Sequence, residues 1–260
     1  QIVCENWRNL ISVGAKPIAI TNCLNFGNPE NPEVMGEFAE CLIGIKESCE
    51  FLNFPVVSGN VSFYNGTNNK NIFPTPVIGG VGLISDINYS INHQFKKNNS
   101  IIILLGKTFG HLEQSSFYEE IYSLTEGLPP EINLNNEKNN GDCVLEIIKN
   151  KLANSVHDVS SGGLIVALAE MSIGSNYGVK IIKPKKLTNL IKYFFGEDQS
   201  RYILEIDKKN IEKLEKILKN NNVYYEIIGT TQKEYFEIEG ELKIDTKKLY
   251  NVNNKWYNNY

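Results

Sequence analysis

The chain has 260 residues, 42% of them apolar, and a formal net charge of −4 at pH 7. This length is enough for one large domain or two modest ones, and the apolar fraction is enough for a buried core. The negative charge argues against a nucleic-acid-binding protein, because such proteins usually carry a basic face.

The five cysteines, at positions 4, 23, 41, 49 and 143, do not indicate a disulfide framework or a zinc site. Their number is odd and none is spaced CxxC, so we expect a reduced, cytoplasmic protein. No apolar run approaches the ~20 residues of a membrane-spanning helix, and we expect neither a membrane nor a nucleic-acid partner. The chain begins with Gln1 inside a helix-like pattern, so we expect a fragment of a longer polypeptide.

The first 86 residues alternate between helical and extended patterns. Val3, Trp7 and Leu10 recur at helical spacing, and Gly14 is typical of a helix C-cap. A second helix is expected where apolar residues recur every three or four positions from Val34. The patterns predict helices at 3–13 and 32–52, strands at 17–21, 56–64 (interrupted at 58–60) and 76–84, and a hairpin-like loop at 66–71.

A polar, aperiodic stretch, INYSINHQFKKNNS at 87–100, suggests a domain boundary. Beyond it, strands again alternate with helices, which favours an α/β or α+β class. The patterns predict strands at 101–105, 155–158, 202–206, 223–231 and 235–244, helices at 115–124, 141–150, 162–173 and 210–219, and a loop at 125–140.

Two strand ends in the first part are rich in amides and glycine. Residues 21–28, TNCLNFGN, precede the 32–52 helix, whose N-terminus suits phosphate binding. Residues 58–65, SGNVSFYN, contain Gly59, which allows close backbone approach, and Asn60, whose amide oxygen is a possible Mg²⁺ ligand. The alternative readings are a capped strand-to-helix loop and an ordinary β-bulge.

Two further stretches combine charged and small residues. HDVSSGGL, at 157–164, places an ionisable pair at a strand end before a helix; it fits an anion or metal site, but also simple helix capping by Asp158 or Ser160. FGEDQSRY, at 195–202, offers Arg201 as a phosphate ligand or as a partner of Glu197. The alternative is a solvated charged loop before a strand.

Together, NCLNFGNPENPEVMGEF, PVVSGNVSFYN, PTPVIGGVGLI, HDVSSGGLIVALAEM and FGEDQSRY resemble, in order and spacing, the C-terminal half of the phosphoribosylformylglycinamidine synthase (PurL) family. This family belongs to the aminoimidazole-ribonucleotide-synthetase-like superfamily. The resemblance implies a two-domain unit: a truncated N-terminal half-barrel domain at 1–90 that contacts ATP and substrate, and a C-terminal α/β sandwich domain at 98–260.

The resemblance also implies a reaction. ATP phosphorylates the formyl-amide oxygen of formylglycinamide ribonucleotide, and ammonia then displaces the phosphate through an iminophosphate intermediate, giving formylglycinamidine ribonucleotide. ATP and Mg²⁺ are the implied cofactors. The implied partners are the N-terminal half of the same synthase, a PurQ-like glutaminase subunit and a small PurS-like subunit. We expect the isolated chain to be inactive.

The family's site residues transfer by motif. Asn22 and Gly59 match ATP-binding positions, although the family often has an acidic residue at the first. Asn60 matches a Mg²⁺ ligand and Ser62 a substrate contact. An auxiliary or pseudo-symmetric site is implied at Asp158, Glu197, Gln199 and Arg201; no histidine of this chain inherits a catalytic role.

Two other functions stay open at this stage. The chain could be a non-catalytic lobe that binds a nucleotide, or nothing, and stabilises its partner half. It could also belong to another ATP-dependent enzyme of the same superfamily.

Overall fold

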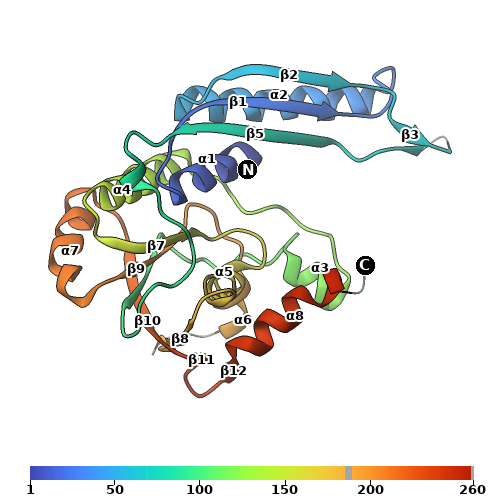
Figure 1. Ribbon diagram of the computed structural model, residues 1–260. Helices are drawn as coiled ribbons and strands as arrows, with labels where there is room; N and C mark the ends of the chain where they lie inside the picture. Colours follow the sequence, from blue (N-terminus) through green and yellow to red (C-terminus); the bar gives the residue numbers. More distant parts are fainter. Residues whose placement is uncertain (69, 185–188, 259–260) are drawn as a thin grey trace. The chain divides into compact units, whose positions relative to one another are not determined.

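The computed structural model describes residues 1–68, 70–184 and 189–258 (Figure 1). The chain divides into two compact units. The N-terminal unit comprises Gln1–Ile11 and Ala15–Ser85, and the C-terminal unit comprises Ser12–Gly14 and Asp86–Tyr260. The part of the chain that the structure describes contains no helix with the length and apolarity needed to cross a bilayer.

The N-terminal unit is built on an open three-stranded sheet in the order β2-β1-β5. The central strand β1 pairs in parallel with β2 and antiparallel with β5. Among the described residues this sheet does not close into a barrel. Its elements are α1 (Ile2–Ser12), β1 (Lys16–Asn25), α2 (Pro32–Leu52), β2 (Val56–Ser62), the short hairpin strands β3 (Gly66–Thr67) and β4 (Lys70–Asn71), and β5 (Thr75–Leu83).

Helices α1 and α2 cover one face of this sheet (Figure 1). Gly80 of β5 lies under α1, because a Cβ there would overlap with the side chain of Asn6. Phe38 of α2 packs edge-on against Phe26 and Phe63, which follow the two parallel strands, with ring centroids 5.1 and 5.0 Å away. Burial of these rings fixes the helix over the ends of β1 and β2.

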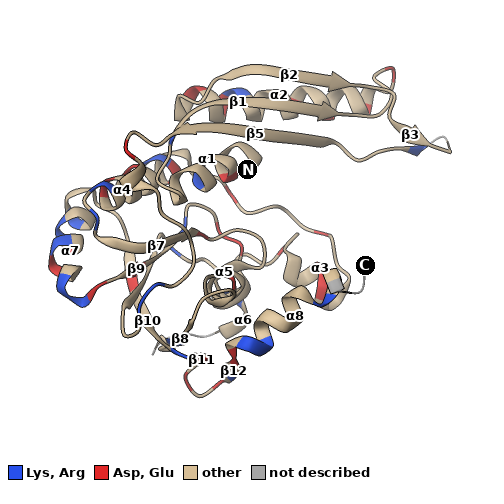
Figure 2. Cartoon of the chain, viewed as in Figure 1, with Lys and Arg blue, Asp and Glu red and all other residues tan. Residues whose placement is uncertain are grey.

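The other face of the sheet is open. Along β5, every second residue is exposed, including Val77, Val81 and Leu83 at 51–60%. Strands β2 and β5 carry no charged side chain, and β1 carries only Lys16 (Figure 2). Because an exposed, uncharged and partly apolar sheet face is characteristic of an interaction surface, it suits burial against another polypeptide.

The C-terminal unit contains a seven-stranded mixed sheet in the order β12-β11-β8-β10-β6-β9-β7. Its elements are η1 (Ile87–Tyr89), β6 (Ile101–Leu105), α3 (Ser116–Tyr122), α4 (Leu134–Lys149), β7 (Ala153–Asp158), α5 (Gly163–Ser172), β8 (Tyr177–Ile181), α6 (Leu190–Phe195), β9 (Tyr202–Ile206), η2 (Lys208–Asn210), α7 (Ile211–Asn220), β10 (Tyr225–Lys233), β11 (Tyr235–Ile238), β12 (Leu242–Asp245) and α8 (Thr246–Asn258).

The main core of this unit lies between the sheet and helix α5. Ile102 and Leu104 of β6 and Ile203 of β9 pack against Leu164 and Leu168 of α5 in one cluster of buried residues. The amphipathic helices α4 and α7 also bury apolar side chains, notably Val144, Ile147, Leu214 and Leu218. The sheet is central because its middle strands read as continuous apolar runs, which require cover on both faces.

Several predicted elements match the structure and others need correction. The strands at 101–105 and 202–206 and the helix at 32–52 have the predicted bounds. The predicted interruption at 58–60 is wrong: β2 runs continuously from Val56 to Ser62. The strand predicted at 17–21 continues to Asn25, because β1 pairs with a strand on each side and its amides do not end it.

The loop predicted at 125–140 is helical from Leu134. Asn133 caps this helix by accepting a hydrogen bond from the Asn136 N–H, and the polar run that follows concealed the helix from an apolar-periodicity argument. The single strand predicted at 235–244 is two strands, β11 and β12, joined at Gly240, whose φ of +76° permits the turn. Strand β8 and helices α6 and α8 were not predicted. The hairpin predicted at 66–71 is present as β3 and β4, with residue 69 outside the described part.

Candidate functional site

The two amide-rich segments of the N-terminal unit lie side by side. Strands β1 and β2 are parallel, and their register pairs Asn22 with Gly59, Cys23 with Asn60 and Asn25 with Ser62. The preceding pair, Thr21 and Ser58, is joined by a hydrogen bond of 2.8 Å from Ser58 Oγ to Thr21 Oγ1. The register therefore brings all four predicted ligand-binding positions onto two adjacent strand ends.

The four side chains nevertheless divide between the two faces of the sheet. Asn22 is half-buried on the helix-covered face, and a Cβ on Gly59 would overlap with its Oδ1. Asn60 lies on the open face, where its Nδ2 is 3.9 Å from Cys23 Sγ. Ser62, two residues further along β2, faces the same way, because side chains alternate along a strand. A ligand on the open face would meet Asn60 and Ser62, whereas Asn22 shapes the strand end from behind.

The loop after β1 uses most of its amides for its own structure. Asn28 Oδ1 accepts a hydrogen bond from the Glu30 N–H, and Asn31 Oδ1 accepts one from the Glu33 N–H at the start of α2, both at 2.9 Å. Asn71 Oδ1 accepts from the Asn28 N–H at 3.1 Å. These bonds account for the density of asparagine here as turn and helix caps.

The overlap at Gly59 yields a testable prediction for stability. Gly59→Ala should lower the free energy of unfolding by about 1 kcal/mol, because the new methyl group displaces the Asn22 amide. In the double variant Gly59→Ala/Asn22→Ala the two changes should compensate, and chemical denaturation of the single and double variants measures this coupling. Strictly additive effects would show that Asn22 is not the reason for glycine at this position.

The C-terminal unit also brings its predicted site residues together. Strand β9 pairs with β7, and this places the 195–201 loop beside Asp158. Glu197 Oε1 accepts hydrogen bonds from the N–H groups of Ser116 and Gly162, at 2.8 and 2.7 Å. Gln199 Nε2 donates to the Glu197 carbonyl at 3.2 Å. These contacts fasten the start of α3 and the turn before α5 to one loop.

The guanidinium of Arg201 is fully buried in the same loop. It donates to the backbone carbonyls of Gly196 and Asp198 and, over 3.1 Å, to Thr108 Oγ1. A buried arginine with this many backbone partners holds the loop in shape. The alternative of a solvated charged loop is wrong, because Arg201 and Asp198 are buried. The structure favours a structural role for Glu197 and Arg201 over direct ligand binding.

Sequence reasoning missed Asp198, whose carboxylate organises the loop after β6. Oδ2 accepts from the N–H groups of Phe109 and Gly110, at 2.9 and 2.8 Å, and Oδ1 accepts from the His111 N–H at 3.2 Å. Consecutive N–H groups that converge in this way form an anion-binding concavity, and here the chain's own carboxylate fills it. Asp198 lies within the charged stretch FGEDQSRY that the sequence singled out, but Glu197, Gln199 and Arg201 were chosen there instead.

His157 forms a charged cluster with two carboxylates. Its Nε2 lies 3.0 Å from Glu170 Oε2 and its Nδ1 lies 3.4 Å from Asp158 Oδ1. Burial lowers the pKa of His157, but hydrogen bonds to Asp158 and Glu170 and their negative charges outweigh this and raise the pKa to about 9. His157 is therefore an imidazolium at neutral pH, and Asp158 serves it as a counter-ion.

This raised pKa sets a pH window for stability. Because the folded pKa exceeds the ordinary value of 6.5, the stabilisation is fully present below about pH 6.5 and is lost as the pH rises through about 9. We expect His157→Gln to lower the free energy of unfolding by roughly 1–3 kcal/mol at pH 6, and by much less at pH 9.5. Denaturant titrations of both proteins across this range measure the difference, and a difference independent of pH would contradict the assignment.

The residues of the described part offer few ligands for a divalent cation. Among them, no group of three or more His, Cys, Asp or Glu side chains is placed so that it could hold a metal ion. At the strand ends of the N-terminal unit, the candidate is the single amide oxygen of Asn60. Since Mg²⁺ is commonly held by one or two protein oxygens together with substrate phosphates, Asn60 fits as one ligand of a set completed from outside this chain.

Comparisons with known proteins match each of the two units to a domain of one protein family. The N-terminal domain of AIR synthase related proteins matches residues 1–84, and the C-terminal domain of the same family matches residues 97–239. The phosphoribosylformylglycinamidine synthase subunit PurL of Pelagibacter ubique is 51% identical over the whole chain. The chain spans about a third of that relative's length, 36%.

Solved structures show the same fold. Thermotoga maritima PurL complexed with FGAR matches with a TM-score of 0.73 and 16% sequence identity, over 95% of this chain and 42% of that one. The PurLQS structure from the same organism matches with a TM-score of 0.68 and 15% identity, over 94% and 40%.

Proposed function

The chain belongs to the AIR synthase related family, and from this premise we propose that it is the C-terminal part of a phosphoribosylformylglycinamidine synthase. The observation that supports this best is the parallel register of β1 and β2, which sets Asn60 and Ser62 on an open, uncharged sheet face beside the Asn22–Gly59 pair. The predicted domains, 1–90 and 98–260, remain part of this proposal.

The proposed reaction is the ATP-dependent amidation of formylglycinamide ribonucleotide. The amide oxygen is a poor leaving group, so it first attacks the γ-phosphorus of ATP and releases ADP. Ammonia then adds to the activated carbon, and phosphate leaves to give formylglycinamidine ribonucleotide. Because both steps move phosphate charge, the protein's contribution is to position the two ligands and to stabilise charge.

Each of the four residues on β1 and β2 has a proposed role in positioning ATP and the ribonucleotide. Gly59 contacts ATP through its backbone, and its missing Cβ leaves room on the covered face for Asn22, which holds β2 from behind. Asn60 offers its amide oxygen to Mg²⁺, which would neutralise phosphate charge, and Ser62 offers its hydroxyl to the ribonucleotide. Its Oγ lies 3.1 Å from Asn65 Nδ2, which orients it from the neighbouring turn.

The open face of the N-terminal sheet is the proposed binding surface for the main partner. Exposed Val56, Val77 and Val81 would be buried against the N-terminal half of the same synthase, which supplies the remaining catalytic groups. We also propose that a PurQ-like glutaminase delivers ammonia and that a PurS-like subunit joins the assembly; the existence of a PurLQS structure from Thermotoga maritima supports such an assembly. The proposed location of the protein is the cytoplasm, where its five cysteines would stay reduced.

The contacts within the C-terminal unit support a stabilising role for this unit, in addition to the ligand contacts proposed for the N-terminal unit. Glu197 and Arg201 bind backbone groups of their own unit, so the proposed auxiliary set at Asp158, Glu197, Gln199 and Arg201 contributes mainly to the fold. This supports the stabilising-lobe function for the second unit, while ligand contacts remain with the first.

An activity assay of the full-length protein tests the proposed function. Incubation with formylglycinamide ribonucleotide, ATP, Mg²⁺ and ammonium chloride should give ADP, phosphate and formylglycinamidine ribonucleotide in equal amounts. Formation of ADP only with a different acceptor would assign the protein to another reaction of the superfamily. We expect the 260-residue chain alone to show no turnover.

A further inference from the structure

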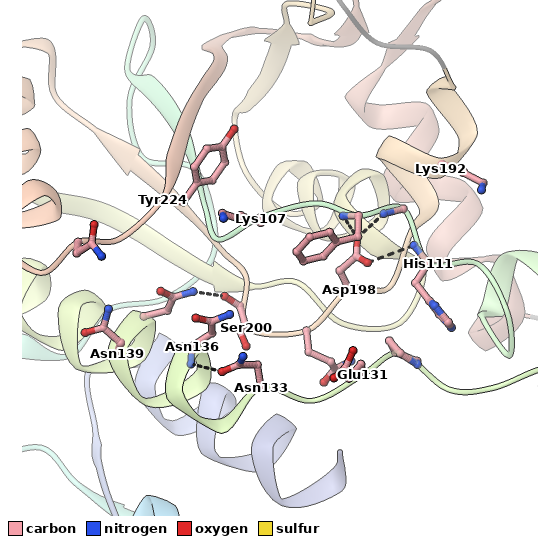
Figure 3. A pocket seen from close by; sticks show the side chains of 16 residues that line it. Lys107, His111, Glu131, Asn133, Asn136, Asn139, Lys192, Asp198, Ser200 and Tyr224 are labelled. Atoms are coloured by element: carbon pink, nitrogen blue, oxygen red, sulfur yellow. Dashed lines mark hydrogen bonds between the residues drawn. The ribbon is translucent and has the colours of Figure 1, made fainter.

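The C-terminal unit contains a cavity to which the proposed reaction assigns no ligand; of the auxiliary set, Gln199 lines it. Its volume is about 660 Å³, within the range of small-molecule sites (Figure 3). It lies between the N-terminal turns of α4, the loop after β6 and the residues before β9 and β10. Six of its lining residues carry side-chain amides: Asn133, Asn136, Asn139, Asn140, Gln199 and Asn222.

The cavity wall has an available cation and a neutralised anion. Lys107 lies on the side opposite the α4 asparagines, with its Nζ 5.9 Å from the ring centroid of Tyr224 (Figure 3). Within the described part of the chain Lys107 forms no ion pair. Asp198 also lines the cavity, but its carboxylate accepts three backbone N–H groups and lies 4.0 Å from the Arg201 guanidinium. An anion beside Lys107 therefore meets little repulsion from Asp198, and Glu131 is the other acid of the lining.

The amides on the opposite wall are oriented as hydrogen-bond acceptors. Asn139 Nδ2 donates to the Asn221 carbonyl at 2.9 Å, and Asn140 Nδ2 donates to the Ser200 carbonyl at 2.8 Å. One N–H of each amide is thus used within the fold and orients the group, and each Oδ1 remains as an acceptor for a ligand. Acceptors in this position suit a ligand with hydroxyl donors.

The backbone conformation of Ser200 is further evidence that this wall of the cavity binds a ligand. Its φ is +63°, a left-handed conformation that serine adopts only at a cost. The bond from Asn140 and the close packing of Gly106 against the Ser200 carbonyl hold it there. Residues held in such conformations cluster at ligand sites.

From these contacts we propose that the cavity binds a sugar phosphate group. The phosphate pairs with Lys107, and the sugar hydroxyls donate to the amide oxygens of Asn139 and Asn140. A free sugar phosphate and a nucleotide both carry this group. All residues that line the site belong to the C-terminal unit.

Calorimetric titration of the full-length protein tests this site. The probes are ribose 5-phosphate, AMP and inorganic phosphate, each titrated into wild type, Lys107→Gln and Lys216→Gln. Lys216 is an exposed residue of α7 outside the cavity lining, so its variant makes the same charge change elsewhere. We expect Lys107→Gln to weaken binding of ribose 5-phosphate at least tenfold and Lys216→Gln to leave it unchanged. Asn139→Leu should weaken ribose 5-phosphate more than inorganic phosphate.

The three probes distinguish a nucleotide from a free sugar phosphate, and they also define the results that would contradict the proposal. AMP that binds more tightly than ribose 5-phosphate identifies a nucleotide, and equal affinities identify a free sugar phosphate. Inorganic phosphate that binds as tightly as ribose 5-phosphate would overturn the proposal, because the hydroxyl groups would then contribute nothing. Binding that Lys107→Gln does not change would also overturn it. A Ser62→Ala variant retains this binding if the cavity is the site, whatever happens to turnover.

Discussion

Asn60→Ala in the full-length protein should reduce kcat/KM for the amidation on the order of 100-fold and leave the melting temperature unchanged. Asn60 lies on the open face of β2, and its side chain makes a weak 3.9 Å contact with Cys23 Sγ, so its removal costs the fold little. If the amide oxygen helps hold Mg²⁺ against the ATP phosphates, the loss falls on the chemical step. Steady-state kinetics at saturating Mg²⁺, with thermal denaturation in parallel, measure both quantities.

Ser58→Ala is the matched control for this prediction. Ser58 lies on the same strand and the same face, and its hydroxyl donates to Thr21 Oγ1 within the sheet. Its variant should therefore keep near-normal turnover. Ser62→Ala should raise the KM for the ribonucleotide more than it lowers kcat, because it removes a substrate contact. Normal turnover in Asn60→Ala and Ser62→Ala, combined with a lowered melting temperature, would instead favour the non-catalytic lobe.

Helices and strands were most predictable from the sequence where the local pattern of apolar and capping residues was enough to specify them. Helix α2 begins at a proline after Asn31 and ends at Asn53, so capping and apolar spacing agree. Strands β6 and β9 are unbroken apolar runs, and such runs specify buried central strands. Helix α4 begins with polar residues whose role appears only in the folded unit, where Asn140 binds the Ser200 carbonyl. Periodicity carries no information about that contact.

The candidate site was predictable as a set of positions but not as a geometry. Sequence reasoning named Asn22, Gly59, Asn60 and Ser62, and the register of β1 and β2 makes them neighbours. It took the glycine and the asparagines as signs of a broken strand, whereas the strand is continuous and its alternation sends Asn22 and Asn60 to opposite faces. Strand pairing decides such questions, and a single segment does not reveal its partners.

Asp198→Ala should lower the free energy of unfolding by about 3–5 kcal/mol, the largest effect on stability expected for a substitution in the C-terminal unit. The carboxylate is 5% exposed and accepts N–H groups from Phe109, Gly110 and His111. Its removal leaves these donors without an acceptor and takes a carboxylate, 4.0 Å away, from buried Arg201. Asp198→Asn should lose less, roughly 1–3 kcal/mol, because one carbonyl oxygen remains to accept.

Asp142→Ala provides the comparison, because Asp142 pairs with Lys138 over 3.1 Å on the surface of α4. Exposed pairs of this kind contribute about 0–1 kcal/mol, so this variant should unfold almost like wild type. Denaturant titrations of the three variants should therefore rank Asp198→Ala below Asp198→Asn and both well below Asp142→Ala. Equal stability of Asp198→Ala and Asp142→Ala would mean that the loop after β6 holds its shape without the carboxylate, and the structural role inferred for the FGEDQSRY segment would fail with it.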